Sequence, residues 1–197
     1  DEQTQIRLIK GQGADTLWLR MYQNSIHKQM PEYNPEGLEA WLETQDKDLQ
    51  EEGKEYGHQI EKHIKETILR KLEELYGSIW ESKVKKIMGK CLQRMGDDED
   101  VDNQDWTDLM TLQDYKEIIE SNWSVKKDDD ESFITFEDEF AIQVSDAFRT
   151  KTDKLKWIND LITFSKAWTT TKGRPLSQAE VNEMQSILQS LVPTEEY

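Results

Sequence analysis

The histidines are the first residues to consider for metal or acid–base chemistry, because imidazole titrates near neutral pH and binds zinc. Two of them, His58 and His63, lie close together in the chain, with Glu61 between them. A helical zinc site uses the HExxH spacing, which places both imidazoles on one face. The separation seen here rotates the two side chains about 140° apart on a helix. We therefore predict solvent-facing or interface histidines and no metal site.

Two other patterns suggest ligands without completing a site. Asp98, Asp100 and Asp102 alternate as the ligands of an EF-hand loop do, but the glycine and glutamate that such a loop requires further along are missing. The interpretation is a solvated acidic loop. The GQG sequence at residues 11–13 lacks the third glycine or the Gly-Lys-Ser/Thr ending of a phosphate-binding turn, so we interpret it as a hairpin turn. No cofactor is expected.

Composition restricts the partners and the compartment. With 25 Lys and Arg against 41 Asp and Glu, the net charge is −16, which disfavours direct nucleic-acid binding because phosphate contacts need clustered cations. The lysines at 83, 85, 86 and 90 are interpreted as a solvated helix face. The single Cys91 lies on an apolar stripe, which predicts a buried, inert thiol in a reducing compartment. The sequence contains no apolar span or secretory leader, so a cytoplasmic location is expected.

The elements that position any site are helices, because apolar residues recur at spacings of three and four. Residues 30–37, MPEYNPEG, hold two prolines and a glycine and mark a boundary. We predict an N-terminal segment or linker over residues 1–37 and a helical domain over residues 38–197. Residues 1–30 fit either a β-hairpin or the tail of an upstream domain. The predicted fold class is all-α, a bundle of about six or seven helices.

The apolar stripes place these helices over residues 38–49, 56–75, 80–95, 112–119, 133–148, 155–168 and 181–191.

Helix boundaries are predicted from capping residues. Thr107 or Thr111 is the expected N-cap of the fourth helix, and Thr152 of the sixth. Ser177-x-x-Glu180 is a capping box for the last helix, because the serine can accept the amide three residues on while the glutamate reaches back.

The order of several segments resembles the HEPN superfamily. These segments are residues 38–80, which end in YGSIW, residues 109–123 (LMTLQDYKEIIESNW), then FEDEF and KLKWINDLITF. The resemblance covers roughly residues 38–192 and is to the branch found at the C-termini of bacterial defence and NTPase-linked proteins and of a eukaryotic transcript-surveillance endoribonuclease. It implies an all-α bundle of four or more helices that is often dimeric.

The resemblance also implies a site. Active members are metal-independent RNases whose R-x4–6-H motif supplies a cation and a proton-transfer group at a helix end. With Trp168 and the following turn in register, Ser165 stands at the arginine position, Lys166 at the polar position after it and Thr170 at the histidine position. Neither serine nor threonine supplies a fixed cation or titrates near neutral pH. We therefore expect no catalytic residues at this helix end.

The function predicted on these grounds is a non-catalytic, HEPN-like interaction or oligomerisation module of a bacterial defence or stress-response protein. It would bind a second copy or another protein through apolar helix faces. One alternative is an endoribonuclease with displaced catalytic groups, tested at Arg20, His27, His63 and Lys166; Arg20 and His27 have R-x6-H spacing outside the motif helix. Another is an acidic helical inhibitor or binding protein for a basic partner, in which the charge of −16 acts directly.

Overall fold

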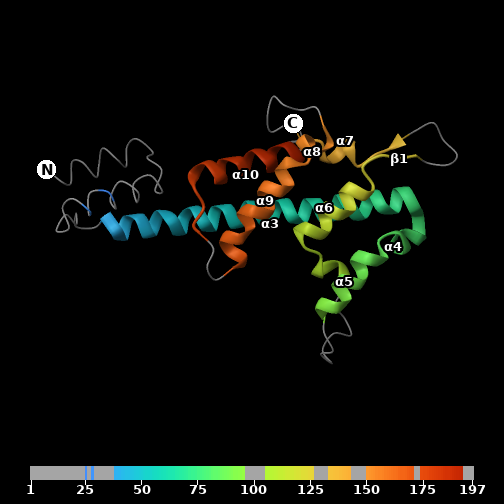
Figure 1. The fold of residues 1–197 in the computed structure, drawn as a ribbon, viewed down its shortest axis with the longest axis horizontal. Coiled ribbons are helices and arrows are strands. Elements are labelled where there is room, and N and C mark those ends of the chain that lie inside the picture. Colours follow the sequence, from blue (N-terminus) through green and yellow to red (C-terminus); the bar gives the residue numbers. More distant parts are fainter. Residues whose placement is uncertain are drawn as a thin grey trace, which may run out of the picture. The chain divides into compact units, whose positions relative to one another are not determined.

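The structure is a computed structural model that describes Ser25, Lys28 and residues 38–95, 105–126, 133–142, 150–170 and 174–192. The chain divides into two compact units. The first contains residues 1–57 and 164–186, and the second contains residues 58–163 and 187–197. Three helices contribute residues to both units (Figure 1). Each unit is described by itself below.

The described elements are, in chain order, α3 (Leu38–Tyr76), η1 (Gly77–Ile79), α4 (Trp80–Lys83), α5 (Lys85–Met95), η3 (Trp106–Leu109), α6 (Leu112–Ser121), β1 (Val125–Lys126), β2 (Phe133–Ile134), α7 (Glu137–Phe140), α8 (Lys151–Lys154), α9 (Lys156–Thr169) and α10 (Gln178–Leu191).

The all-α prediction is confirmed for the described residues. Extended structure there is confined to β1 and β2, which pair antiparallel with Val125 opposite Ile134. The hairpin considered for residues 1–30 lies outside the described residues, as do residues 11–13. The boundary after residue 37 stays a prediction. Among the described helices, none is both long enough and apolar enough to cross a membrane.

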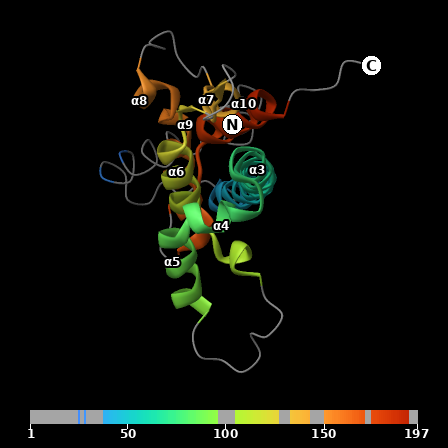
Figure 2. The same cartoon turned by 90° about the vertical axis from the view of Figure 1, so that its right-hand side faces the viewer.

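Residues 38–76 form one continuous helix, so the prediction of two separate helices here was wrong. Figure 1 follows α3 along its length, and Figure 2 views it nearly along its axis. Residues 50–55, between the two predicted stripes, are Glu, Gln and Lys apart from Gly53; these three types are good helix formers, and the stretch contains no proline. The helix ends at Gly77, whose φ of 55° is the left-handed conformation that glycine adopts without strain.

In the first unit, two glycines allow neighbouring side chains to approach α3 closely: Leu176, which precedes α10, and Trp168 of α9. A Cβ at Gly53 would lie 2.2 Å from Leu176, and one at Gly57 would lie 2.6 Å from the Trp168 ring. Gln50 adds a polar contact, because its Nε2 donates to the carbonyl of Ala167 at 2.7 Å. The glycines that weaken helix propensity in α3 therefore make room for its packing partners.

The core of the second unit contains the apolar face of α3 and a group of aromatic rings. The α3 residues Ile60, Ile64, Ile68 and Leu72 are fully buried. Phe136 and Phe140 stack with ring centroids 5.9 Å apart, and Phe140 stacks on Trp157 at 6.5 Å. The buried Trp157 indole donates to the carbonyl of Phe140 at 3.0 Å.

Two other predicted helices are interrupted. The stripe over 80–95 breaks at Val84, whose φ of −112° and ψ of 22° end α4, and whose carbonyl accepts from Ile87 and Met88 at the start of α5. The described part of the stripe over 133–148 forms β2 and then the short α7, and residues 143–148 lie outside the described residues. α7 ends at Phe140, whose carbonyl accepts from the Trp157 indole and from the amide of Ile142. The spacing of the apolar residues predicts neither break.

The capping predictions had mixed outcomes. Ser177 and Glu180 form the expected box, with the Ser177 amide 2.8 Å from a Glu180 carboxylate oxygen. Thr111 caps α6, whereas Thr107 lies within η3. Thr152, the predicted N-cap of the helix over residues 155–168, was wrong. Thr150 caps α8, because Asp153 lies three residues after it and completes a capping box.

Candidate functional site

The three positions singled out by the HEPN resemblance lie at the C-terminal end of α9 or just beyond it. The Ser165 side chain is buried, and those of Lys166 and Thr170 are exposed. Thr170 Oγ1 donates to the Lys166 carbonyl, and Thr169 Oγ1 donates to the Ser165 carbonyl, each at 2.8 Å. These bonds occupy backbone acceptors that a helix end leaves unsatisfied. The Thr170 hydroxyl is therefore occupied by a hydrogen bond to the backbone at the end of the helix.

The histidine cluster is spread along α3 in the second unit. His58 is exposed, and Nε2 of the half-buried His63 lies 3.4 Å from Thr67 Oγ1. Burial raises the pKa of the Glu61 carboxyl, and the charge of His58 opposes that shift. Within the described residues no group of three His, Cys, Asp or Glu side chains could hold a metal ion. Arg20, His27 and the aspartates at 98, 100 and 102 lie outside the described residues.

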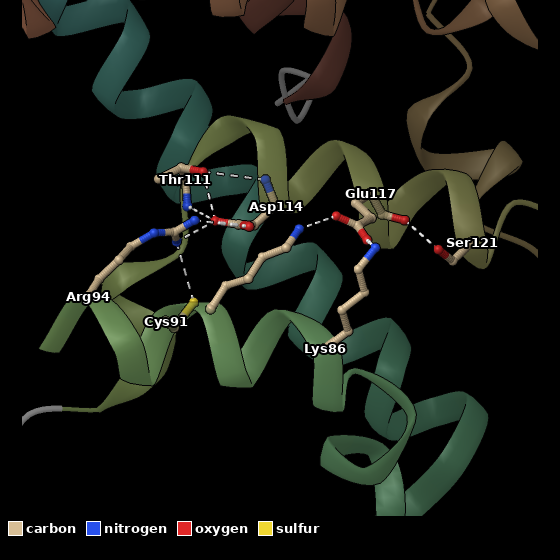
Figure 3. Close-up of polar contacts among 8 residues, drawn as sticks. Lys86, Cys91, Arg94, Thr111, Asp114, Glu117 and Ser121 are labelled. Atoms are coloured by element: carbon tan, nitrogen blue, oxygen red, sulfur yellow. Dashed lines mark hydrogen bonds and ion pairs between the residues drawn. The ribbon is translucent and has the colours of Figure 1, made fainter.

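A cluster of polar and charged side chains joins α5 to α6 (Figure 3). We call it the α5–α6 seam. It contains three cations of α5, two carboxylates of α6, and the neighbouring Thr111 and Cys91: the cations are Lys86, Lys90 and Arg94, and the carboxylates are Asp114 and Glu117.

Asp114 is the buried centre of the seam, with only 1% of its side chain exposed. Arg94 binds it through both terminal nitrogens, at 2.6 and 3.3 Å. The amide and hydroxyl of Thr111 donate to Asp114 Oδ2 at 2.9 and 2.7 Å, which completes the capping box of α6. Burial opposes ionisation of Asp114, but the hydrogen bonds from Arg94 and Thr111 outweigh it and lower the pKa of the carboxyl. Asp114 is therefore a fixed anion at neutral pH.

Glu117 lies one turn further along α6 and accepts two lysines. Lys86 Nζ lies 2.6 Å from one carboxylate oxygen, and Lys90 Nζ lies 2.5 Å from the other. These hydrogen bonds lower the pKa of Glu117. Asp114 and Glu117 lie three residues apart on α6, and each binds cations of α5 (Figure 3). The seam sets the rotation of α5 about its own axis.

Cys91 faces the same seam and is fully buried, which confirms its predicted burial. Arg94 Nη1 lies 3.6 Å from its sulfur. Burial, reinforced by the charge of Asp114, raises the pKa of the thiol even though Arg94 and Lys90 oppose this. A protonated, buried thiol is a poor nucleophile. The chemistry of the seam is therefore that of paired charges.

The opposite side of α5 carries apolar side chains toward solvent. Met88 and Met95 are half-buried, Leu92 is 49% exposed, and a Cβ at Gly89 would meet no atom within 4 Å. Met88, Leu92 and Met95 follow one another at spacings of four and three, so they form a single stripe. We call these residues, with the exposed Lys85 that borders them, the outer face of α5. The buried Ile87 and Cys91 form its inner face.

Comparisons with known proteins add no relative. No family model, curated protein or solved structure matches the chain. The HEPN resemblance thus rests on the sequence alone.

Sequence reasoning found parts of this region without joining them. It placed Cys91 in a core, Thr111 at a cap and Lys86 and Lys90 on a solvated face. Lys86 is exposed and Lys90 half-buried, and both also pair with Glu117. Arg94 and Asp114 were not singled out. A usable signal for Asp114 was present, because an acidic residue three positions after a capping threonine completes a capping box.

Proposed function

We propose that residues 38–197 act as a non-catalytic, HEPN-like interaction module whose contact surface is the outer face of α5. The observation that supports this most directly is the exposure of Leu92, at 49%, beside two half-buried methionines. Burying a fully exposed leucine is worth about 1.5–3 kcal/mol, and Leu92 is half exposed, so covering it is worth about half of that. A partner that covers this stripe therefore gains binding free energy.

The seam supports the proposal because it holds the inner face of α5 in place. Arg94, Lys86 and Lys90 are drawn toward α6, so the helix cannot roll to bury Leu92 without breaking these ion pairs. Methionines are flexible and polarisable, which suits a surface that must fit another protein. The outer face thus combines a fixed helix with adaptable side chains.

The non-catalytic part of the proposal is supported by the end of α9. Ser165 and Thr170 replace the arginine and histidine that the family chemistry needs, and Thr170 is committed to a backbone bond. Placement in a bacterial defence or stress-response protein follows from the same resemblance and is proposed with it.

The test is whether association depends on Leu92. The whole chain is studied by sedimentation alone and by calorimetry with amphipathic helical peptides, comparing the wild type with Leu92→Glu. Val192→Glu is the matched control, because Val192 is also exposed, at 41%, and lies outside α5. We expect the wild type and the control to associate with a copy or a peptide, and Leu92→Glu to fail. Association in none of these assays, or association that Leu92→Glu leaves unchanged, contradicts the proposal.

A labelled single-stranded RNA tests the non-catalytic part separately. We expect the RNA to stay intact with the wild type. Cleavage that disappears in Lys166→Ala or His63→Ala would instead support the endoribonuclease alternative.

A further inference from the structure

A hollow in the first unit lies beside α3 and the end of α9. Its lining residues all belong to that unit: Lys47, Gln50, Glu51 and Lys54 of α3, and Trp168 of α9. Its volume is about 270 Å³. Sites for drug-sized ligands usually have about 300–1,000 Å³, so this hollow suits a ligand of one or two rings. It shares no residue with the outer face of α5, so its role is separate from the proposed function.

Trp168 forms a flat wall of the hollow and is held in place. Its six-membered ring lies against the α3 backbone at Gly57, where an added Cβ would lie 2.6 Å from Cζ2 and 2.9 Å from Cη2. Gln50 fixes the same part of α9, because its Nε2 donates to the carbonyl of Ala167 at 2.7 Å. The Trp168 side chain is half-buried, and its indole N–H has no acceptor among the described residues. The wall therefore offers an aromatic surface and a free donor.

Two lysines of α3 stand beside this wall without a partner. Lys47 and Lys54 are exposed, and neither forms an ion pair or a hydrogen bond with any described residue. They are seven residues apart, so they lie within about 20° of each other around the helix and about 10 Å apart along it. Each ammonium is carried on a flexible four-carbon stem, so both can reach one group that lies between them. An anion is the group that two such cations favour.

Glu51 is the one carboxylate among the lining residues, and it lies on the far side of the lysines from the indole. Around α3 it is about 120° from Gly57, where the Trp168 ring is seated, whereas the two lysines are about 60–80° from Gly57. With two lysines and one glutamate, the lining carries a net charge of +1 in a chain of net charge −16. The charges nearest the aromatic wall are therefore positive.

We infer that this hollow binds a small aromatic anion, a ligand of one or two flat rings that carries one carboxylate, sulfonate or phosphate group. The rings lie against Trp168, and the anionic group lies between Lys47 and Lys54. An apolar surface that supplies contact area, with a few polar groups that fix orientation, is the usual composition of a small-molecule site.

Other ligands of the same size fit the hollow less well. A neutral aromatic molecule leaves both lysines without a partner. A cationic one is repelled by the two lysines and is attracted only by Glu51 at the outer edge. A saturated ring with a carboxylate keeps the charge but loses the stacking on Trp168. Each of these is an outcome of the test.

The experiment titrates the whole chain with four probes and follows the indole N–H signals by two-dimensional NMR. The probes are naphthoate, neutral naphthylmethanol, cationic naphthylmethylammonium and cyclohexanecarboxylate. The chain has seven tryptophans, so the signal of Trp168 is identified by its loss in Trp168→Phe. We expect naphthoate to shift this signal saturably with a Kd on the order of 1 mM, as for a ligand of about a dozen heavy atoms. The other three probes should bind at least about threefold more weakly.

Substitutions of exposed side chains test the charges without disturbing the packing of Trp168. Lys47→Gln and Lys54→Gln should each weaken naphthoate about two- to fivefold, as expected for exposed charge pairs, and leave naphthylmethanol unchanged. Glu51→Gln should tighten naphthoate slightly, because a like charge is removed. Lys62→Gln is the matched control, because Lys62 is exposed on α3 and lies in the second unit. Circular dichroism checks that each variant keeps its helices.

Three results would overturn the inference. The first is the absence of a saturable shift at Trp168, or a shift that is larger at another tryptophan. The second is binding of the neutral, cationic or saturated probe as tight as that of naphthoate. The third is an affinity for naphthoate that Lys47→Gln and Lys54→Gln change no more than Lys62→Gln does. None of these results bears on association through Leu92, so the proposed function is judged by its own assays.

Discussion

Two helices of this protein begin with the same kind of polar arrangement. At α6, Thr111 and Asp114 form a capping box, and Arg94 binds the aspartate. At α10, Ser177 and Glu180 form the box, and Arg174 binds the glutamate at 2.8 Å. The local bonds are nearly equal, with the cap amide 2.9 Å from its carboxylate in the first box and 2.8 Å in the second.

The two boxes differ in where the arginine comes from and how deeply the carboxylate is buried. Arg174 is only six residues from Glu180, and both are more exposed, at 60% and 14% of their side chains. Arg94 belongs to a different helix, twenty residues from Asp114, whose side chain is 1% exposed. The same motif therefore caps a single helix in one place and, in the other, also joins two helices.

Removing each carboxylate should separate the two roles most clearly. Asp114→Ala is expected to lower the free energy of unfolding by about 3 kcal/mol, because it removes a cap and the buried partner of Arg94. Glu180→Ala is expected to cost only about 1 kcal/mol, the usual value of a cap. Urea denaturation followed by circular dichroism measures both. Equal losses would show that the seam contributes no more than a local cap.

Removing each arginine should give a smaller contrast in the same direction. Arg94→Ala leaves a buried carboxylate with Thr111 as its remaining donor, and we expect a loss of about 2 kcal/mol. Arg174→Ala exposes its partner to water and should cost under about 0.5 kcal/mol. Double-mutant cycles with Asp114→Ala and Glu180→Ala measure the coupling in each pair. A larger coupling at Arg174 would reverse the comparison.

The pH dependence of stability should follow the same ranking. The folded-state pKa of Asp114 and that of Glu180 are both lowered, in each case because hydrogen bonds to the ionised form outweigh burial. Each carboxylate therefore stabilises the fold above its unfolded pKa, about 3.9 for Asp and 4.3 for Glu, and this contribution is lost as the pH falls through the lowered folded value. The free energy of unfolding, measured between neutral and acidic pH, should become less dependent on pH in both variants. This change should be larger in Asp114→Asn than in Glu180→Gln. A wild type whose stability rises on acidification through this window would contradict the sign.

Salt should produce the smallest effect. The Arg174–Glu180 pair is more exposed, so raising the salt to about 1 M should remove most of its coupling. The Arg94–Asp114 pair is screened less because Asp114 is buried, and it should keep more than half of its coupling. Repeating the double-mutant cycles at low and high salt measures this. A proportional loss at both pairs would indicate that Asp114 is reached by ions in solution.

Local features of the fold could be predicted from sequence. The stripe through Ile60, Ile64 and Ile68 lies in the core, and the Ser177–Glu180 box caps α10, because both depend on residues no more than four positions apart. Thr150 was missed although its box is equally local, because the apolar stripe rather than Asp153 was used to place the cap. The break after Phe140 could not be predicted, because the Trp157 indole that donates to the carbonyl of Phe140 lies seventeen residues away in the chain.

The candidate site was less predictable than the fold. The pairing of Lys86 and Lys90 with Glu117 was not predicted, because Glu117 lies 31 and 27 residues away and nothing near the lysines indicates it. The expectation at Ser165, Lys166 and Thr170 came from a resemblance, and it stays a prediction. Leu92 belonged to the predicted apolar stripe over residues 80–95, and the spacing did not indicate which residues of that stripe face solvent.

The sequence by itself determined the helical class, the capping residues, the apolar stripes and the charge, because each depends on residue types and on backbone bonds over about one turn. Only the tertiary structure decided that Arg94 meets Asp114, and that Leu92 faces solvent while Cys91 does not. These outcomes depend on which distant segments pack together. An amphipathic stripe wider than its packing partner does not specify which of its edges is covered.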